Sequence, residues 1–257
     1  MGNSIKKLSN DINELPTYNH PWYEKKIAII GDSISDPAHI GTTKCYYEYM
    51  QDLLHMTYQS YAQNGAQSNL IISQAQQIKA YEDNNNVKFD AIFVFMGTND
   101  YMSNIQLGEW FTYTDDSYYD HGYSPQLRTF TDSGTTFKSR LNIGLGYLTT
   151  NFPDCQIILL TPIHRSKFDT SQPDENYSNR LKLYINDYVN VVKEASSIWS
   201  TELIDLFSVS RLFPHDDSYV KFFAGDTRPD RLHPNALGHL RIAKTIIAKL
   251  NSIAVLS

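Results

Sequence analysis

KIAIIGDS, residues 26–33, is the stretch of this 257-residue chain that decides its fold. Its short apolar run ends at Gly31, which is typical of a buried strand in a parallel sheet. Similar runs follow along the chain and alternate with longer segments of helical period. This alternation predicts βαβ units, and therefore an α/β domain around a mostly parallel central sheet.

The same periodicity assigns the other elements and leaves two segments irregular. Expected strands cover residues 26–31, 56–62, 89–96, 156–161 and 198–206, and expected helices cover residues 44–55, 69–81, 136–152, 176–195 and 236–250. Residues 101–133 and 208–231 follow neither pattern. Because the sequence contains no linker composition or internal repeat, we expect one domain over residues 1–257, with an aromatic-rich insertion at about residues 101–133.

Composition excludes several functional classes. A net charge of −6 provides no basic surface for nucleic acid or anionic lipid. The two cysteines, Cys45 and Cys155, lie far apart in the sequence and suggest two buried apolar side chains rather than a disulfide framework or a zinc site. Neither a signal peptide nor an apolar membrane span is visible. We therefore expect a soluble, cytoplasmic protein, although a leader removed earlier would leave no trace and secretion stays open.

Three short polar motifs follow strand-like segments. Ser33 comes directly after the first strand, Gly65 lies in the turn after the second, and Asn99 follows the strand at residues 89–96. Because the carboxyl ends of parallel strands share one edge of a sheet, a hydroxyl, a backbone N–H and an amide donor are expected to meet there. Each motif also has a simple structural explanation: Ser33 could cap a helix, and the other two could belong to turns.

A fourth motif, DRLHPN at residues 230–235, places a carboxylate and an imidazole three residues apart before the last helix. If Asp230 binds one ring nitrogen of His233, the other nitrogen can face a serine, which is the division of labour in a Ser-His-Asp triad. A structural histidine beside a capping aspartate is the alternative.

Together, and in this order, the four motifs resemble the sequence blocks of the SGNH (GDSL-type) hydrolase family. The resemblance implies a three-layer α/β/α sandwich with about five strands in the flavodoxin-like order 2-1-3-4-5. It also implies that Ser33 is the nucleophile, that His233 is the base oriented by Asp230, and that Ser33, Gly65 and Asn99 form the oxyanion hole. Acylation and deacylation of a serine need no metal and no organic cofactor.

The resemblance leaves the substrate open. We expect a carboxylic ester hydrolase acting on small-molecule or carbohydrate esters with short, acetyl-type acyl groups. An acyltransferase or thioesterase with the same triad is the first alternative, and a non-catalytic glycan-binding module is the second. Oligomeric state cannot be inferred from the sequence.

Three further residues are candidates for substrate contact. The insertion at residues 101–133 starts at the catalytic edge of the sheet, so we expect it to form part of the pocket wall and to present Trp110 and Tyr113 to the substrate. A small satellite core under a long loop is the alternative. His164 follows the strand at residues 156–161 and could also reach the substrate, or lie in a surface loop.

Overall fold

The computed structural model of the chain describes residues 20–116, 125–167, 174–225 and 230–256. Its centre is a parallel sheet of five strands in the order β2-β1-β3-β6-β7. The strands are β1 (Lys26–Gly31), β2 (Thr57–Ser60), β3 (Ala91–Phe95), β6 (Gln156–Leu160) and β7 (Glu202–Ile204). Counted within this sheet, the order is 2-1-3-4-5, which confirms the fold predicted from the sequence.

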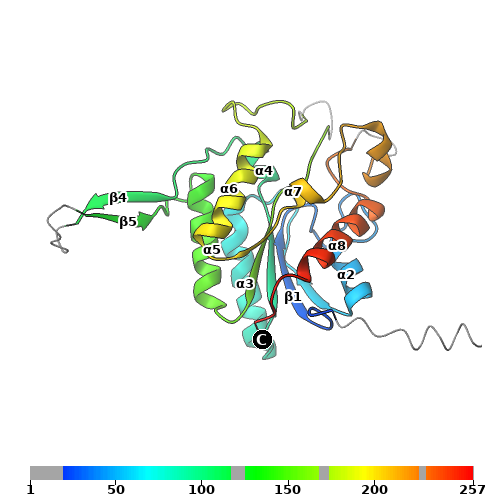
Figure 1. The fold of residues 1–257 in the computed structure, drawn as a ribbon, viewed down its shortest axis with the longest axis horizontal. Coiled ribbons are helices and arrows are strands. Elements are labelled where there is room, and N and C mark those ends of the chain that lie inside the picture. The colour runs from blue at the N-terminus through cyan, green and yellow to red at the C-terminus, as the bar shows by residue number, and fades with distance from the viewer. Residues whose placement is uncertain (1–19, 117–124, 168–173, 226–229, 257) are drawn as a thin grey trace, which may run out of the picture.

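Helices cover both faces of the sheet (Figure 1). One face carries α2 (Tyr46–Leu54) and α8 (Ala236–Leu250), and the other carries α3 (Ile71–Asn85), α5 (Phe137–Asn151) and α6 (Ile185–Ile198). Alternation along β1 explains the two layers: Ile27 and Ile29 belong to the first core, and Ala28 and Ile30 to the second. Burial of β1 on both faces fixes its register, because a slip by one residue would exchange the two cores.

Shorter elements connect these layers. They are η1 (Ser68–Leu70), α4 (Thr98–Met102), β4 (Phe111–Asp115), β5 (Gln126–Phe130), α7 (Leu206–Val209) and η2 (Asp217–Phe222). None of the described helices is both long and apolar enough to cross a membrane.

The main boundary error concerns the helix expected at residues 176–195, which begins only at Ile185. Asn179 prevents an earlier start, because its side-chain oxygen accepts hydrogen bonds from the backbone N–H groups of Leu181 and Leu183. Asp187 then accepts from the N–H of Tyr184 and caps the helix at its observed start. Asparagine side chains of this kind compete with helical hydrogen bonds.

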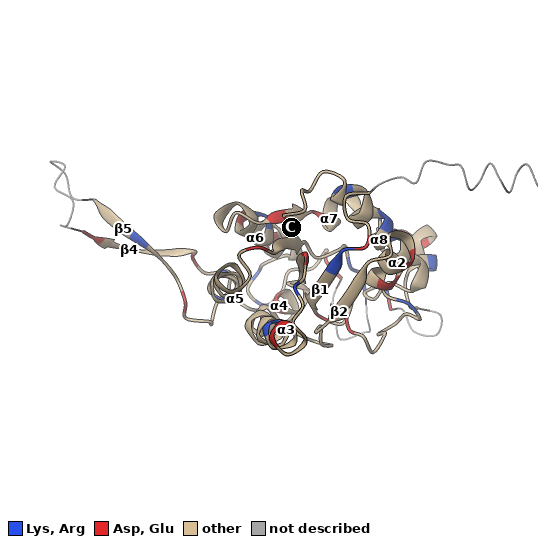
Figure 2. Cartoon of the chain, turned by 90° about the horizontal axis from the view of Figure 1, so that it is seen from below, with Lys and Arg blue, Asp and Glu red and all other residues tan. Residues whose placement is uncertain are grey.

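Within the segment at residues 101–133, the described strands β4 and β5 lie away from the sheet, and residues 117–124 lie outside the described part of the chain. Strands β4 and β5 pair as an antiparallel hairpin that extends beyond α5 and α6, away from the sheet, in both views (Figures 1 and 2). Trp110 lies at its root with only 6% of its surface exposed, and its indole N–H donates to Glu194 of α6 at 2.8 Å. Packing against the helices buries the Trp110 ring, which favours the satellite core that the sequence offered as the alternative, and a contact of Trp110 with substrate stays a prediction.

Candidate active site

Ser33 and His233 meet at the carboxyl end of β1, although 200 residues separate them in the sequence. The hydroxyl oxygen of Ser33 lies 3.0 Å from Nε2 of His233. Both residues are buried, with 6% and 5% of their surfaces exposed. Ser33 reaches this position because β1 ends at Gly31 and the chain turns at once, with the N–H of Ser35 bonded to the carbonyl oxygen of Asp32 at 3.0 Å.

The other ring nitrogen of His233 is bound by Asp230: Nδ1 lies 2.9 Å from the carboxylate Oδ2. A carboxylate can only accept, so Nδ1 carries the proton and Nε2 of the neutral ring accepts from the Ser33 hydroxyl. The second carboxylate oxygen of Asp230 accepts from the N–H groups of Leu232 and His233 at 3.0 and 2.9 Å. Asp230 is therefore fixed at both oxygens and orients the imidazole.

Local backbone structure holds His233 in place just before α8. Its carbonyl oxygen accepts from the N–H of Ala224, and Asn235 caps α8 by accepting from the N–H groups of Leu237 and Gly238. On the other side of the histidine, Gly41 has a left-handed φ of 71°, and a Cβ there would lie 2.8 Å from the Cβ of His233. The loop that contains Gly41 thus packs directly against His233.

Burial and hydrogen bonding shift the pKa values of two carboxyl groups at the site. Burial opposes ionisation of Asp230, but its bonds to His233 hold the pKa of Asp230 below its ordinary value, so that it is a carboxylate at neutral pH. Asp32 behaves differently, because burial raises its pKa to about 7. The two acids therefore differ in charge over a wide range of pH.

Gly65 lies in the turn after β2 and Asn99 in α4, and hydrogen bonds join these two segments. Asp100, fully buried, accepts from the N–H and the hydroxyl of Ser68 at 2.9 and 2.6 Å and pairs with Arg140 at 3.1 Å. The side-chain amide of Asn99 donates to the carbonyl oxygen of Ala66 at 2.9 Å. One amide hydrogen is thereby used to fix Asn99 beside the Gly65 turn, and the other has no partner among the described residues and can meet a ligand.

Sequence reasoning missed two charged residues close to this site. Arg165 is 1% exposed, its guanidinium donates to the Thr98 hydroxyl at 3.4 Å, and burial lowers its pKa. It acts electrostatically on Asp32 and Asp230. The signal for Asp32 was its place in the GDS motif, but no sequence pattern linked the distant Arg165 to that motif.

His164 lies beyond β6 and is engaged by a buried carboxylate. Its Nδ1 is 2.6 Å from Oε1 of Glu175, the same oxygen that His215 approaches at 2.9 Å, and its ring packs on Phe207. These bonds hold the pKa of Glu175 below its ordinary value against the effect of burial. A contact of His164 with substrate stays a prediction.

Metal ligands do not converge on the triad. Within the described parts of the chain, the one group of three or more histidine, cysteine or acidic side chains with converging ligand atoms consists of His39, Cys45 and Glu48. The triad itself offers a serine hydroxyl bonded to an oriented imidazole, which is the arrangement for nucleophilic acyl transfer.

Comparisons with known proteins identify a family and a fold. The model of the family described as GDSL-like Lipase/Acylhydrolase matches residues 27–246. Curated protein sequences gave no significant match. Among solved structures, the chain is similar to a protein from Lactobacillus plantarum, with 22% identity, a TM-score of 0.68, and 90% of this chain and 98% of that chain covered.

Two further solved structures share the fold. One is described as a possible lipase from Chitinophaga pinensis, with 19% identity, a TM-score of 0.62, and 90% of this chain and 99% of that chain covered. The other is an acetylxylan esterase from Geobacillus stearothermophilus, with 17% identity, a TM-score of 0.53, and coverage of 89% and 94%. Identities this low establish a common fold rather than a common substrate.

Proposed function

Since the chain belongs to the GDSL-like lipase/acylhydrolase family, we propose that it is a serine carboxylic ester hydrolase that acts through an acyl-enzyme on Ser33. The observation that carries the proposal is the chain of two hydrogen bonds from Ser33 through His233 to Asp230, at 3.0 and 2.9 Å. A binding protein has no need for an imidazole held between a serine and a carboxylate.

The proposed mechanism assigns a role to each member of this chain. His233 takes the hydroxyl proton as Ser33 attacks the ester carbonyl, and the Asp230 carboxylate stabilises the imidazolium that forms. His233 then gives the proton to the leaving alcohol, which leaves an acyl group on Ser33. Water activated by His233 releases the acid and restores the serine.

We propose an oxyanion hole formed by the backbone N–H groups of Ser33 and Gly65 and the side-chain amide of Asn99. The bond from Asn99 to Ala66 supports this role, because it fixes the amide before substrate arrives. Donors fixed in advance stabilise a developing oxyanion without reorganising during the reaction.

Short acyl groups are the proposed substrates, as esters of small alcohols or of carbohydrates. A cavity beneath the site, lined by residues that include Asp32, Phe95 and Thr98, leaves no room even for a water molecule. The packing beside Asp32 thus offers no buried channel for a long acyl chain on this side of the site, which supports an acetyl-type group.

The proposal is tested by labelling and turnover in one experiment. A fluorophosphonate should modify the wild-type chain once, at Ser33, and the Ser33→Ala variant not at all. Wild-type protein should hydrolyse p-nitrophenyl acetate much faster than p-nitrophenyl palmitate, and acetylated sugars should be tested beside them.

Three outcomes would change the assignment. Absence of labelling in folded wild-type protein would favour the glycan-binding module. Labelling with faster transfer of the acyl group to an added alcohol or thiol than to water would favour an acyltransferase. Faster hydrolysis of palmitate than acetate would refute the short-acyl substrate.

A further inference from the structure

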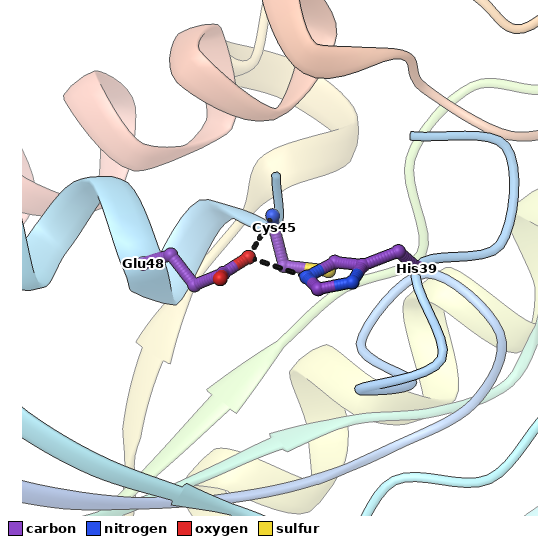
Figure 3. Close-up of side chains that lie close together, drawn as sticks. All are labelled: His39, Cys45 and Glu48. Carbon is purple, nitrogen blue, oxygen red and sulfur yellow. Dashed lines mark hydrogen bonds and ion pairs between the residues drawn. The ribbon is translucent and has the colours of Figure 1, made fainter. Parts of the chain in front are cut away.

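A second group of reactive side chains lies outside the triad, at the first turn of α2 (Figure 3). His39 comes from the loop after β1, Cys45 directly precedes α2, and Glu48 lies in its first turn. One ligand atom from each residue, an imidazole nitrogen, the thiol sulfur and a carboxylate oxygen, lies within 4.8 Å of the other two. Nε2 of His39 is 2.7 Å from Oε2 of Glu48.

We propose that His39, Cys45 and Glu48 form a binding site for a divalent transition-metal ion of the zinc class, with water as the remaining ligand. Nitrogen, sulfur and carboxylate oxygen are the donors that Zn²⁺ takes in proteins. Ca²⁺ and Mg²⁺ prefer all-oxygen sites, so the imidazole and the thiol select against them.

Helix capping accounts for part of this arrangement, because Cys45 and Glu48 form a capping box at the start of α2. Oε2 of Glu48 accepts from the N–H of Cys45 at 2.6 Å, which is half of a capping box. The preferred residues at this position are serine, threonine, aspartate and asparagine, whose oxygens bond the helix better than sulfur does. The Cys45 sulfur also lies 3.7 Å from the carbonyl oxygen of Asp36 and interacts with the side chain of Tyr47, and all of these contacts are weak for sulfur.

Free coordination capacity remains at Glu48. Among the described residues, Oε1 of Glu48 has no hydrogen-bond partner, so this oxygen can bind a cation while Oε2 keeps the N–H of Cys45. His39 has a left-handed φ of 57°, which is uncommon for a residue other than glycine. Its ring is partly exposed, as is Glu48, so a cation can enter from solvent.

Binding requires loss of one proton. The ion replaces that proton on sulfur, and the proton leaves to solvent, so affinity should rise with pH. The positive end of α2 repels a cation, but the thiolate and the Glu48 carboxylate supply two negative charges that outweigh it.

A bound ion would hold the loop that packs against His233 in place. The loop that contains His39 also contains Gly41, which packs against His233. An ion that joins His39 to α2 would fix both ends of this loop, from residue 39 to residue 45. The inferred role is structural, and the inference does not depend on the proposed esterase activity.

The test uses the metal-stripped full chain with Cys155→Ser, in which Cys45 is the only cysteine. Titration with Co²⁺ should give one equivalent bound and a thiolate-to-cobalt charge-transfer band, and Zn²⁺ should displace the cobalt and abolish the band. His39→Gln, Cys45→Ser and Glu48→Gln should each weaken Zn²⁺ binding at least about tenfold, measured by competition with a chromophoric chelator.

A matched control is His55→Gln, since His55 lies at the other end of α2 with a similar left-handed φ of 53° but without a thiol or carboxylate cluster. This variant should bind Zn²⁺ as the parent does. Absence of the charge-transfer band in the folded parent, or equal weakening by His55→Gln, would overturn the proposal. If a ligand variant fails to fold, the cobalt spectrum of the parent still decides.

Discussion

The proposed active site and the hairpin formed by β4 and β5 are built in opposite ways. The site joins Ser33 to His233 across 200 residues of sequence and buries both. The hairpin pairs residues that are close in sequence, and nearly all of its described side chains face solvent. The whole sheet thus holds Ser33 and His233 at a fixed distance from each other. The hairpin, by contrast, depends on the pairing between its own two strands.

The root of the hairpin is the part that contacts the rest of the domain. Phe130 stacks on Trp199 at 4.4 Å, the Arg128 guanidinium lies 4.1 Å above the ring of Phe111, and the N–H of Thr131 donates to the carbonyl oxygen of Trp110. Beyond this root, Tyr113 is 59% exposed. Because isolated two-stranded hairpins are marginally stable in water, contacts at the root should contribute most of the stability of the described strands.

The largest effect on activity is expected when single residues of the proposed triad are replaced. Ser33→Ala and His233→Ala should each lower kcat for p-nitrophenyl acetate by about three orders of magnitude or more, and Asp230→Asn by less. Phe130→Ala in the hairpin serves as the control and should leave kcat nearly unchanged. Near-native turnover by folded Ser33→Ala protein would refute the nucleophile assignment.

Next in size is the effect of Asn99→Ala, which should lower kcat about 100- to 1000-fold with little change in KM. The reason is that its free amide hydrogen should meet charge that exists mainly in the transition state. Steady-state kinetics on the same ester separate the two constants. A large rise in KM with kcat intact would make Asn99 a ground-state binding residue instead.

Most of the sheet could be predicted from the sequence because burial leaves a simple pattern. The apolar run of β1 and the amphipathic period of α8 were located with the observed bounds, Lys26–Gly31 and Ala236–Leu250. The start of α6 was missed because a side chain, Asn179, satisfies backbone groups that would otherwise be helical. Such local competition depends on geometry that hydrophobic period does not reveal.

The site was predictable where the residues lie in short motifs at strand ends. Asp230 and His233 are three residues apart, and the parallel sheet brings Ser33 to the same edge. Arg165 was missed and the burial of Trp110 was not foreseen for a common reason: their neighbours are distant in sequence. An aromatic residue in an irregular segment has the same appearance whether it faces a substrate or, like Trp110, a helix.

A third test addresses Trp110 itself. Trp110→Ala should lower the free energy of unfolding by about 3 kcal/mol, because it removes a buried ring together with its hydrogen bond to Glu194. Urea denaturation measures the loss, and kcat of the folded variant should match wild type. If stability is kept and ester preference changes, Trp110 belongs to the substrate site after all.

Asp32 provides a smaller, pH-dependent test within the site. Its folded-state pKa of about 7 exceeds the ordinary 3.8, so folded protein keeps a proton that the unfolded chain has lost. Stability should therefore fall as pH rises from about 4 to about 7 and then level off. Asp32→Asn should remove this slope and gain at least about 1 kcal/mol near pH 8 relative to wild type.

The measurement is the denaturant midpoint of wild type and variant at several pH values from 4 to 8, which reports how stability depends on the ionisation of Asp32. Asp83→Asn is the control, since Asp83 is exposed and pairs only with Lys79 on the surface of α3. Its slope should equal that of wild type. An unchanged slope in Asp32→Asn would mean that Asp32 ionises in the folded protein as it does in the unfolded chain.

The smallest effect is expected when the hairpin is shortened. Phe111 and Phe130 are directly paired, so residues 112–129 can be replaced by a two-residue Asn-Gly turn that closes on this pair. The ring of Phe130 then keeps its stack on Trp199. We expect kcat/KM for p-nitrophenyl acetate to stay within about twofold of wild type, and stability to change by less than about 1 kcal/mol.

Tyr113→Ala is the single-residue counterpart of this deletion and distinguishes a structural arm from a substrate arm. The position of the hairpin away from the sheet leads us to expect the same ratio of kcat/KM values for p-nitrophenyl acetate and an acetylated sugar as in wild type. A substrate role for Tyr113, as the sequence suggested, would instead lower the value for the sugar alone. If both the deletion and Tyr113→Ala lower kcat/KM for the acetylated sugar equally, the exposed ring of Tyr113 binds substrate at a distance from Ser33. The active site and the hairpin would then act on one ligand.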